Sequence, residues 1–146
     1  MKKTIRIIAC FLLLFCANMK AFGQEKLSED IVADLKQTPK FAFGVSDEFH
    51  LKGVLNIYDT LMDSGVVIEV FEIVVKGKVV KDLVKGSELD TFFEKYRGKV
   101  KVSVCSMAMK KLGVTEAQLF EGLEPVPTAS IRMLQLQANG YNTLSY

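Results

Sequence analysis

The sequence predicts an α/β fold built around a mostly parallel sheet of about five strands. Short segments with the apolar or alternating pattern of strands are followed in turn by segments with the apolar spacing of helices. Glycines, prolines and helix-capping residues separate these segments at most of the boundaries. Strands that alternate with helices over a chain of this length form a parallel sheet covered by helices.

The first half of the chain is expected to supply two strands and a helix. Residues 24–36 have the spacing of a short amphipathic helix or of a lead-in arm. Residues 40–45 read as a buried strand, and residues 51–63 carry a helical apolar face that ends at Gly65. Residues 66–75 are rich in β-branched side chains and predict the second strand.

Residues 78–85 are compatible with two structures. Their valines can continue as the second strand of a hairpin, or they can form the short helix of a crossover connection. The apolar residues share one side, which favours the helix. Residues 88–96 then predict a helix that Ser87 caps and Gly98 ends.

A strand and a helix meet directly in the next part of the chain. Residues 100–104 alternate between apolar and polar side chains, which predicts a strand. Residues 106–112 are helix formers closed by Gly113, and Thr115 is the expected cap of a further helical turn.

The C-terminal part is expected to hold one more helix and one more strand. Residues 124–127 predict an extended link, because each of their two prolines disfavours α geometry in the residue before it. Residues 128–139 have helical spacing, and residues 141–146 predict a terminal strand parallel to the others.

Residues 1–23 have the features of a secretory signal peptide. A basic start reaches Arg6, an apolar run covers residues 7–17, and small residues precede Gln24. The apolar run is shorter than the roughly 20 residues that span a bilayer. We therefore expect residues 24–146 to form one exported domain, periplasmic or otherwise extracytoplasmic, with no stable membrane insertion after cleavage.

Cleavage at this position reverses the sign of the net charge. The 146-residue chain has a formal charge of +2, with 19 basic and 17 acidic side chains. The removed segment contains no acidic residue and four basic ones, namely Lys2, Lys3, Arg6 and Lys20. The remaining chain carries a charge of −2, which gives no electrostatic reason to expect binding to nucleic acid or to an anionic membrane.

Cleavage also removes Cys10 and Cys16 and leaves Cys105 without a cysteine partner in the chain. Lipid attachment at Cys16 is disfavoured, because Phe15 stands where a lipoprotein signal has a small residue. Cys105 lies between a predicted strand and a predicted helix, where unpaired backbone amides favour a thiolate. The carboxyl ends of parallel strands are also where reactive groups gather, so Cys105 is the candidate catalytic residue.

A thiolate at Cys105 can attack a sulfane sulfur, hold it as a persulfide and release it to another thiol. Lys101, Lys110 and Lys111 are close in sequence and would favour the thiolate if they reached it. The lack of a second cysteine argues against self-contained dithiol chemistry. The alternative is a packing role, since free cysteine is among the most buried residue types.

His50 is a second candidate site residue. It is the only histidine, and it follows Asp47 and Glu48 in a predicted loop that should face the same cleft as Cys105. A lone histidine in a loop is more often solvated, and nothing in the spacing predicts a metal site or a cofactor. A separate group of lysines is interpreted as a solvated face, because long charged side chains are almost never fully buried; its members are Lys76, Lys78, Lys81 and Lys85.

Residues 102–115, which read VSVCSMAMKKLGVT, resemble the strand, cysteine, helix and Gly-Val segment of the DsrE/DsrF-like sulfur-relay family. That family includes the TusD-type sulfurtransferase subunits. Further segments similar to the family are residues 41–47, 55–65, 66–75, 126–128 and 134–141.

The resemblance implies a flavodoxin-like three-layer α/β/α domain that assembles into homotrimers or hexamers. It also implies a persulfide on Cys105, with donor and acceptor proteins or small sulfane-sulfur compounds as partners. The expected function is therefore that of an exported sulfur carrier or sulfurtransferase without a cofactor. The alternative is a non-catalytic oligomeric binding module of the same fold, which uses the cleft at the sheet edge and keeps Cys105 for packing.

Overall fold

The computed structural model describes residues 26–146, and a five-stranded parallel sheet runs through its centre. The strand order is β4-β3-β2-β1-β5. The strands are β1 (Lys40–Val45), β2 (Val70–Val75), β3 (Lys101–Cys105), β4 (Leu123–Val126) and β5 (Asn142–Ser145). The proposed signal peptide, residues 1–23, lies outside the described residues.

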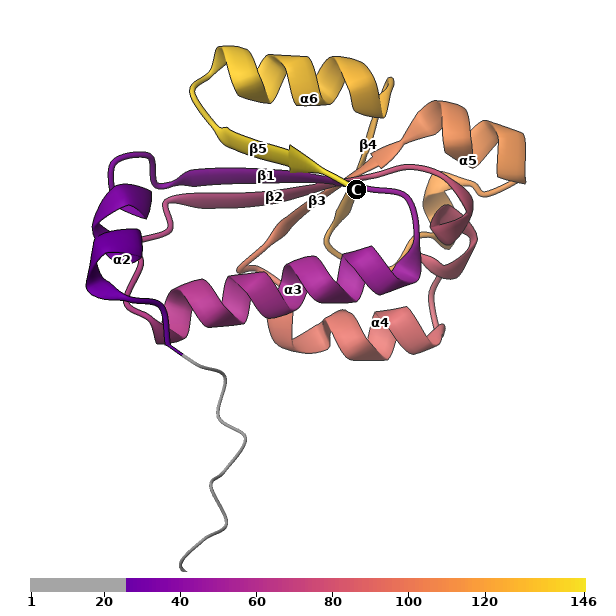
Figure 1. Ribbon diagram of the computed structural model, residues 1–146. Coiled ribbons are helices and arrows are strands. Elements are labelled where there is room, and N and C mark those ends of the chain that lie inside the picture. Colours follow the sequence, from indigo (N-terminus) through magenta and orange to yellow (C-terminus); the bar gives the residue numbers. More distant parts are fainter. Residues whose placement is uncertain (1–25) are drawn as a thin grey trace, which may run out of the picture.

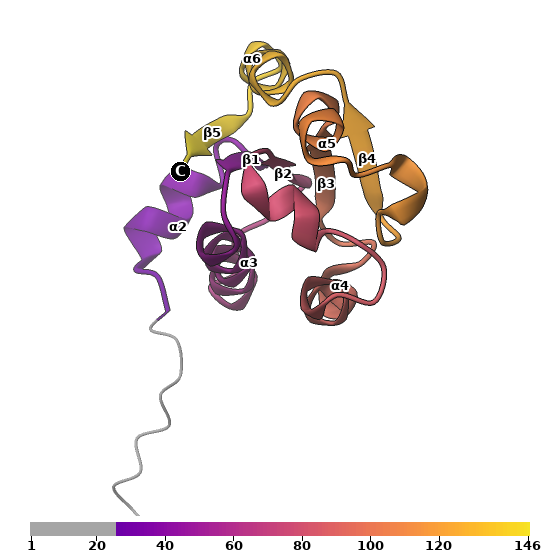
Figure 2. The same cartoon turned by 90° about the vertical axis from the view of Figure 1, so that its right-hand side faces the viewer.

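Helices cover both faces of this sheet. The α-helices are α2 (Glu29–Leu35), α3 (Glu48–Asp63), α4 (Glu88–Phe93), α5 (Ser106–Leu112) and α6 (Ala129–Ala138), and short 3-10 helices occupy Lys78–Asp82, Glu94–Tyr96 and Glu116–Gln118. Figure 1 shows α3 and α4 on one side of the sheet and α6 on the other, and Figure 2 shows the same layers end-on. This is the three-layer, flavodoxin-like α/β arrangement that the sequence predicts.

All five strands point the same way, so their carboxyl ends form a single edge of the sheet. The helix α5 begins at this edge directly after β3, and the C-terminus lies there as well (Figure 1). Within residues 26–146, no helix combines the length and the apolar character needed to cross a membrane.

Two sequence predictions need correction. Residues 124–127 were expected to form a link, but Leu123–Val126 is a strand that pairs with β3. A strand at the sheet edge tolerates Pro125, because its missing N–H leaves no partner unsatisfied inside the sheet. His50 was expected in a loop, but α3 starts at Glu48, since the Asp47 side chain caps the helix by accepting a hydrogen bond from the His50 backbone N–H.

Residues 78–85 follow the helical interpretation over the short 3-10 helix Lys78–Asp82. Val84 then forms an isolated antiparallel bridge with Leu119, outside the main sheet. Ser87 caps α4 as predicted, because its hydroxyl accepts a hydrogen bond from the Asp90 backbone N–H at 3.1 Å.

The sheet face toward α3 and α4 carries the main core. Alternate residues of the three central strands point to this side, among them Phe43, Phe71 and Val104. The Phe71 ring stacks on Phe43 with centroids 5.2 Å apart, and its edge meets Tyr58 of α3 at the same distance. Burial of these aromatic rings anchors α3 to the sheet.

The face toward α6 has a different composition. It carries a small apolar cluster together with two buried polar residues. The buried members of the cluster are Ala42, Val74, Cys105, Ala129 and Leu136, and the polar residues are Glu72 and Ser103. The candidate thiol therefore lies on this second face.

Candidate functional site

Cys105 is the last residue of β3 and also the N-cap residue of α5. The sequence predicts this position at the junction of a strand and a helix. The residue is 7% exposed, and it is the only cysteine among residues 26–146. It belongs to the cluster on the α6 face, so the thiol is packed under α6 in this structure.

The three lysines close to Cys105 in sequence do not surround it in space. Lys101 occupies the opposite end of β3, about 13 Å along the strand by the usual rise per residue, and forms an ion pair with Glu124 at 2.8 Å. Lys110 and Lys111 are exposed in the last turn of α5, more than one helical turn beyond Cys105.

Lys76 is the basic residue that the topology brings to the same edge of the sheet as Cys105. The register pairs Val75 of β2 with Val104 of β3, and Lys76 and Cys105 are the next residues along the chain. Neighbouring strands lie about 4.8 Å apart. Lys76 directly follows β2 at this edge, and it is exposed, as the sequence predicts for Lys76, Lys78, Lys81 and Lys85.

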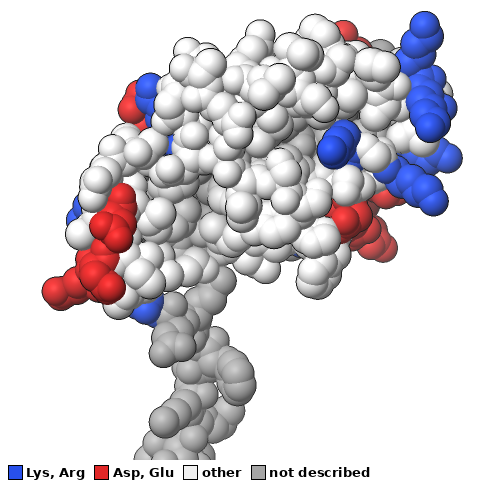
Figure 3. All heavy atoms as spheres, turned by 45° about the horizontal axis from the view of Figure 1, so that its top comes forward, with Lys and Arg blue, Asp and Glu red and all other residues white. Residues whose placement is uncertain are grey.

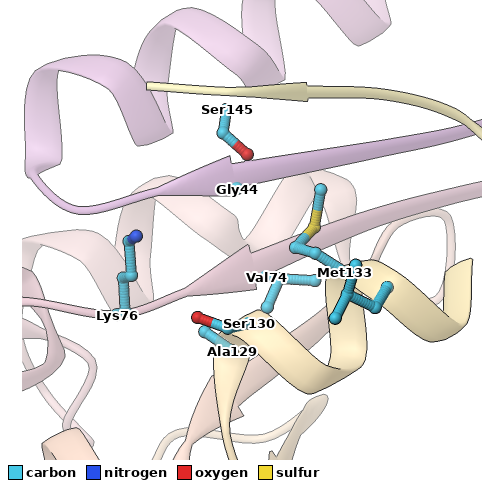
Figure 4. A pocket seen from close by; sticks show the side chains of 8 residues that line it. Gly44, Val74, Lys76, Ala129, Ser130, Met133 and Ser145 are labelled. Atoms are coloured by element: carbon cyan, nitrogen blue, oxygen red, sulfur yellow. The ribbon is translucent and has the colours of Figure 1, made fainter. Parts of the chain in front are cut away.

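A pocket of about 300 Å³ opens at the same edge. It lies between the start of α6 and the carboxyl ends of β1, β2 and β5 (Figure 4). Its lining residues are Gly44, Val74, Lys76, Ala129, Ser130, Met133, Leu134 and Ser145. Cys105 is absent from this wall, but Val74 and Ala129 belong both to the wall and to the apolar cluster that contains the thiol.

The structure does not bring His50 into the cleft of Cys105, contrary to the prediction. His50 lies in the first turn of α3, which packs on the other face of the sheet. It lines a separate cavity of about 160 Å³ with Phe49 and Tyr146, and its ring stacks on Tyr146 with centroids 5.0 Å apart. The helix after β1 turns away from α6, and this separates the two residues.

His50 has a local partner in the Asp47 carboxylate. The Oδ2 atom of Asp47 lies 2.6 Å from Nδ1 of the imidazole, and Oδ1 accepts the His50 backbone N–H at 2.9 Å. The backbone hydrogen bond, followed by that of the ring, lowers the pKa of the Asp47 carboxyl. These contacts give His50 a role in starting α3.

An ion pair between a half-buried arginine and a buried carboxylate connects α6 to the middle of the sheet. Arg132 of α6 donates two hydrogen bonds to the fully buried Glu72 carboxylate, at 2.7 and 2.8 Å, and Ser103 donates a third at 2.6 Å. Burial acts to raise the pKa of Glu72, but the hydrogen bonds from Arg132 and Ser103 outweigh it and hold the pKa below its ordinary value. Glu72 thereby fixes α6 above the cluster that contains Cys105.

The outer surface over α6 is largely uncharged (Figure 3). Lys and Arg side chains gather at the end where the strands finish, on the right of Figure 3, while acidic side chains are more frequent at the opposite end. Two large apolar side chains of α6, Ile131 and Leu134, are 53% and 59% exposed. Among residues 26–146, no group of three or more His, Cys, Asp or Glu side chains is placed to hold a metal ion.

The pattern of the DsrE/DsrF-like family matches residues 49–146, a stretch that includes Lys76, Cys105 and α6. The chain belongs to the DsrE/DsrF-like family. This membership supports a fold of the sulfur-relay type, and the matched stretch contains the strand, cysteine and helix segment described above.

A solved structure of this DsrE-like fold comes from Methanobacterium thermoautotrophicum and is described as the protein of unknown function MTH1491. The two chains share 21% identity with a TM-score of 0.63, and the likeness covers 73% of this chain and 98% of the other. At this level of identity the likeness shows the fold alone. No protein with a curated description matches the chain.

Proposed function

We propose that this DsrE-like protein is a sulfur carrier or sulfurtransferase that holds a persulfide on Cys105. The observation that carries the proposal is the position of Cys105, at the carboxyl end of a central strand and inside the matched family segment. The strand β2, which pairs with β3, brings Lys76 to the same edge of the sheet as Cys105.

The proposed reaction needs no external oxidant or reductant. The Cys105 thiolate attacks the outer sulfur of a persulfide donor, R–S–SH, so one S–S bond forms while the donor S–S bond breaks and R–S⁻ leaves. With thiosulfate as the donor, the leaving group is sulfite. Attack by an acceptor thiolate on the outer sulfur then returns Cys105 to its thiolate form.

The burial of Cys105 sets a condition on this reaction. Val74 and Ala129 belong both to the cluster that buries the thiol and to the wall of the open pocket, and Ala129 is the first residue of α6. Transfer therefore requires a displacement at the start of α6 when a donor or acceptor approaches. The α6 helix buries only two residues, Ala129 and Leu136, whereas α3 buries five. Such a displacement must keep the hydrogen bonds between Arg132 and Glu72, so it is confined to the first turn of α6.

Intact-mass spectrometry tests this proposal. The folded protein without its signal peptide is incubated with thiosulfate or inorganic polysulfide, and the expected product gains about 32 Da, the mass of one sulfur atom. The matched control is Cys105→Ser, which should gain nothing. Absence of the adduct with every donor, together with a thiol that does not react with iodoacetamide, would contradict the proposal.

The burial of Cys105 favours a second candidate function. At 7% exposure Cys105 has the environment of a packing side chain. The neighbouring pocket is open to solvent, and Cys105 is not one of its lining residues. The second candidate is a non-catalytic oligomeric binding module in which the pocket holds a small ligand. Under this function, Cys105→Ser binds its ligand as well as the wild type does and no sulfur adduct forms.

Assembly into homotrimers or hexamers is also proposed, on the basis of the family. The exposed Ile131 of α6 supplies apolar surface that such an assembly would bury. Light scattering at micromolar concentration should give a mass of three or six chains. A strict monomer under these conditions would count against the assembly.

Export through the signal peptide of residues 1–23 remains a proposal from the sequence alone. It predicts that the protein recovered from an extracytoplasmic fraction begins at Gln24. N-terminal sequencing of that material provides the test, and a chain that keeps Met1 and stays in the cytosolic fraction would contradict it.

A further inference from the structure

We infer that the pocket at the start of α6 is a binding site for a short-chain organic anion, with a carboxylate or sulfonate group held by Lys76 and an apolar tail packed against α6. This inference concerns a ligand site and does not depend on a persulfide forming at Cys105.

The polar groups of the pocket are donors without partners. Within residues 26–146, the Lys76 ammonium and the hydroxyls of Ser130 and Ser145 make no hydrogen bond or ion pair. Two other exposed lysines, Lys95 and Lys101, have carboxylate partners. Lys76 is therefore available to a ligand that carries negative charge.

The charges around the pocket select the sign of the ligand. No acidic side chain is among the lining residues, and Lys76 is the only charged one. An anionic group gains a charge-assisted hydrogen bond from Lys76 and, on the same side, one from the Ser130 hydroxyl. Figure 4 shows Lys76 and Ser130 toward one end of the pocket and Met133 toward the other.

The rest of the pocket wall is apolar, and it favours a ligand that has an apolar part. Val74, Met133 and Leu134 line the pocket with hydrocarbon and a thioether, and 59% of Leu134 is exposed. An inorganic oxoanion would leave this surface in water, whereas a tail of three or four carbon atoms would cover it. A volume of about 300 Å³ is at the lower end for small-molecule sites, which is consistent with a ligand of this size.

Gly44 keeps the floor of the pocket open. A Cβ atom at this position would lie 2.7 Å from the Ser145 hydroxyl oxygen, so any side chain would force the Ser145 hydroxyl to move. The absence of a side chain at Gly44 thus preserves both the volume and the hydroxyl on the β5 side.

Titration followed by 1H–15N NMR tests the inference. The protein is the Cys105→Ser variant of residues 24–146, so that sulfur chemistry plays no part, and the probes are butanoate and propane-1-sulfonate. We expect saturable shifts at the Gly44, Ser130 and Met133 amides. Lys76→Ala should weaken binding at least about tenfold through the loss of a charge-assisted hydrogen bond. The matched control Lys78→Ala, an exposed lysine outside the pocket, should change it less than about twofold.

Titrations with butanamide and with sulfate measure the separate contributions of the apolar tail and of the negative charge to binding. Butanamide keeps the tail without the charge, and sulfate keeps the charge without the tail, so each should bind more weakly than butanoate. Non-saturable shifts with both probes, unchanged binding in Lys76→Ala, or equal binding of butanamide or sulfate would each overturn the inference. A saturable site combined with a failed persulfide assay would retain this inference and reject the sulfur-carrier function.

Discussion

The two faces of the sheet differ in the kinds of side chain that they bury. The face under α3 and α4 buries large aromatic and β-branched side chains, with Phe71 in contact with three other rings. The face under α6 buries small residues, a carboxylate and a thiol. Stability therefore resides mainly on the first face, while groups capable of chemistry are held under one short helix on the second.

The largest expected effect comes from the aromatic face. Phe71→Ala removes a ring that is 1% exposed and should lower the free energy of unfolding by about 3–5 kcal/mol. Cys105→Ala on the opposite face should cost about 1 kcal/mol, because it removes a single atom. Urea denaturation of both variants measures the difference, and equal losses would break the distinction between the faces.

The next effect concerns the ion pair under α6. Arg132→Met leaves the buried Glu72 carboxylate with Ser103 alone and should cost about 3 kcal/mol, because an uncompensated charge remains in the interior. Replacing Glu72 by Met as well should restore most of this loss. A double variant as unstable as Arg132→Met would show that the lost packing of Arg132, and not the unpaired charge, causes the effect.

A smaller effect is the pH dependence of stability. The pKa of Glu72 is lower in the folded chain than in the unfolded chain, where it is about 4.3. Its contribution is fully present above that pH and is lost as the pH falls through the folded value. Denaturation between pH 7 and pH 3 should show a steeper loss for the wild type than for Glu72→Gln, and identical slopes would exclude Glu72 as the source.

Much of the fold could be predicted from the sequence because local patterns agree with the tertiary structure. The apolar run of residues 40–45, the alternation of residues 100–104 and the cap Ser87 specify their elements directly. The strand around Pro125 could not be predicted in this way, since only its position at the sheet edge makes proline acceptable.

The candidate site was only partly predictable. The position of Cys105 follows from the sequence pattern, which changes at this residue from the alternation of a strand to the composition of a helix. Its burial depends on α6, which comes more than 20 residues later. Lys76 reaches the same edge of the sheet as Cys105 only through the pairing of β2 with β3. His50 was misplaced because a single sequence does not show to which side of the sheet a helix turns.

We propose that the Cys105 thiol, on the sheet face under α6, carries a sulfur atom. Cyanide attacks the outer sulfur of a persulfide, releases thiocyanate and returns the thiolate, so thiocyanate counts the transferable sulfur. After loading with thiosulfate or polysulfide and removal of the donor, the wild type should release about one thiocyanate per chain and Cys105→Ser none. Equal release from both proteins, or none from either, would contradict the claim.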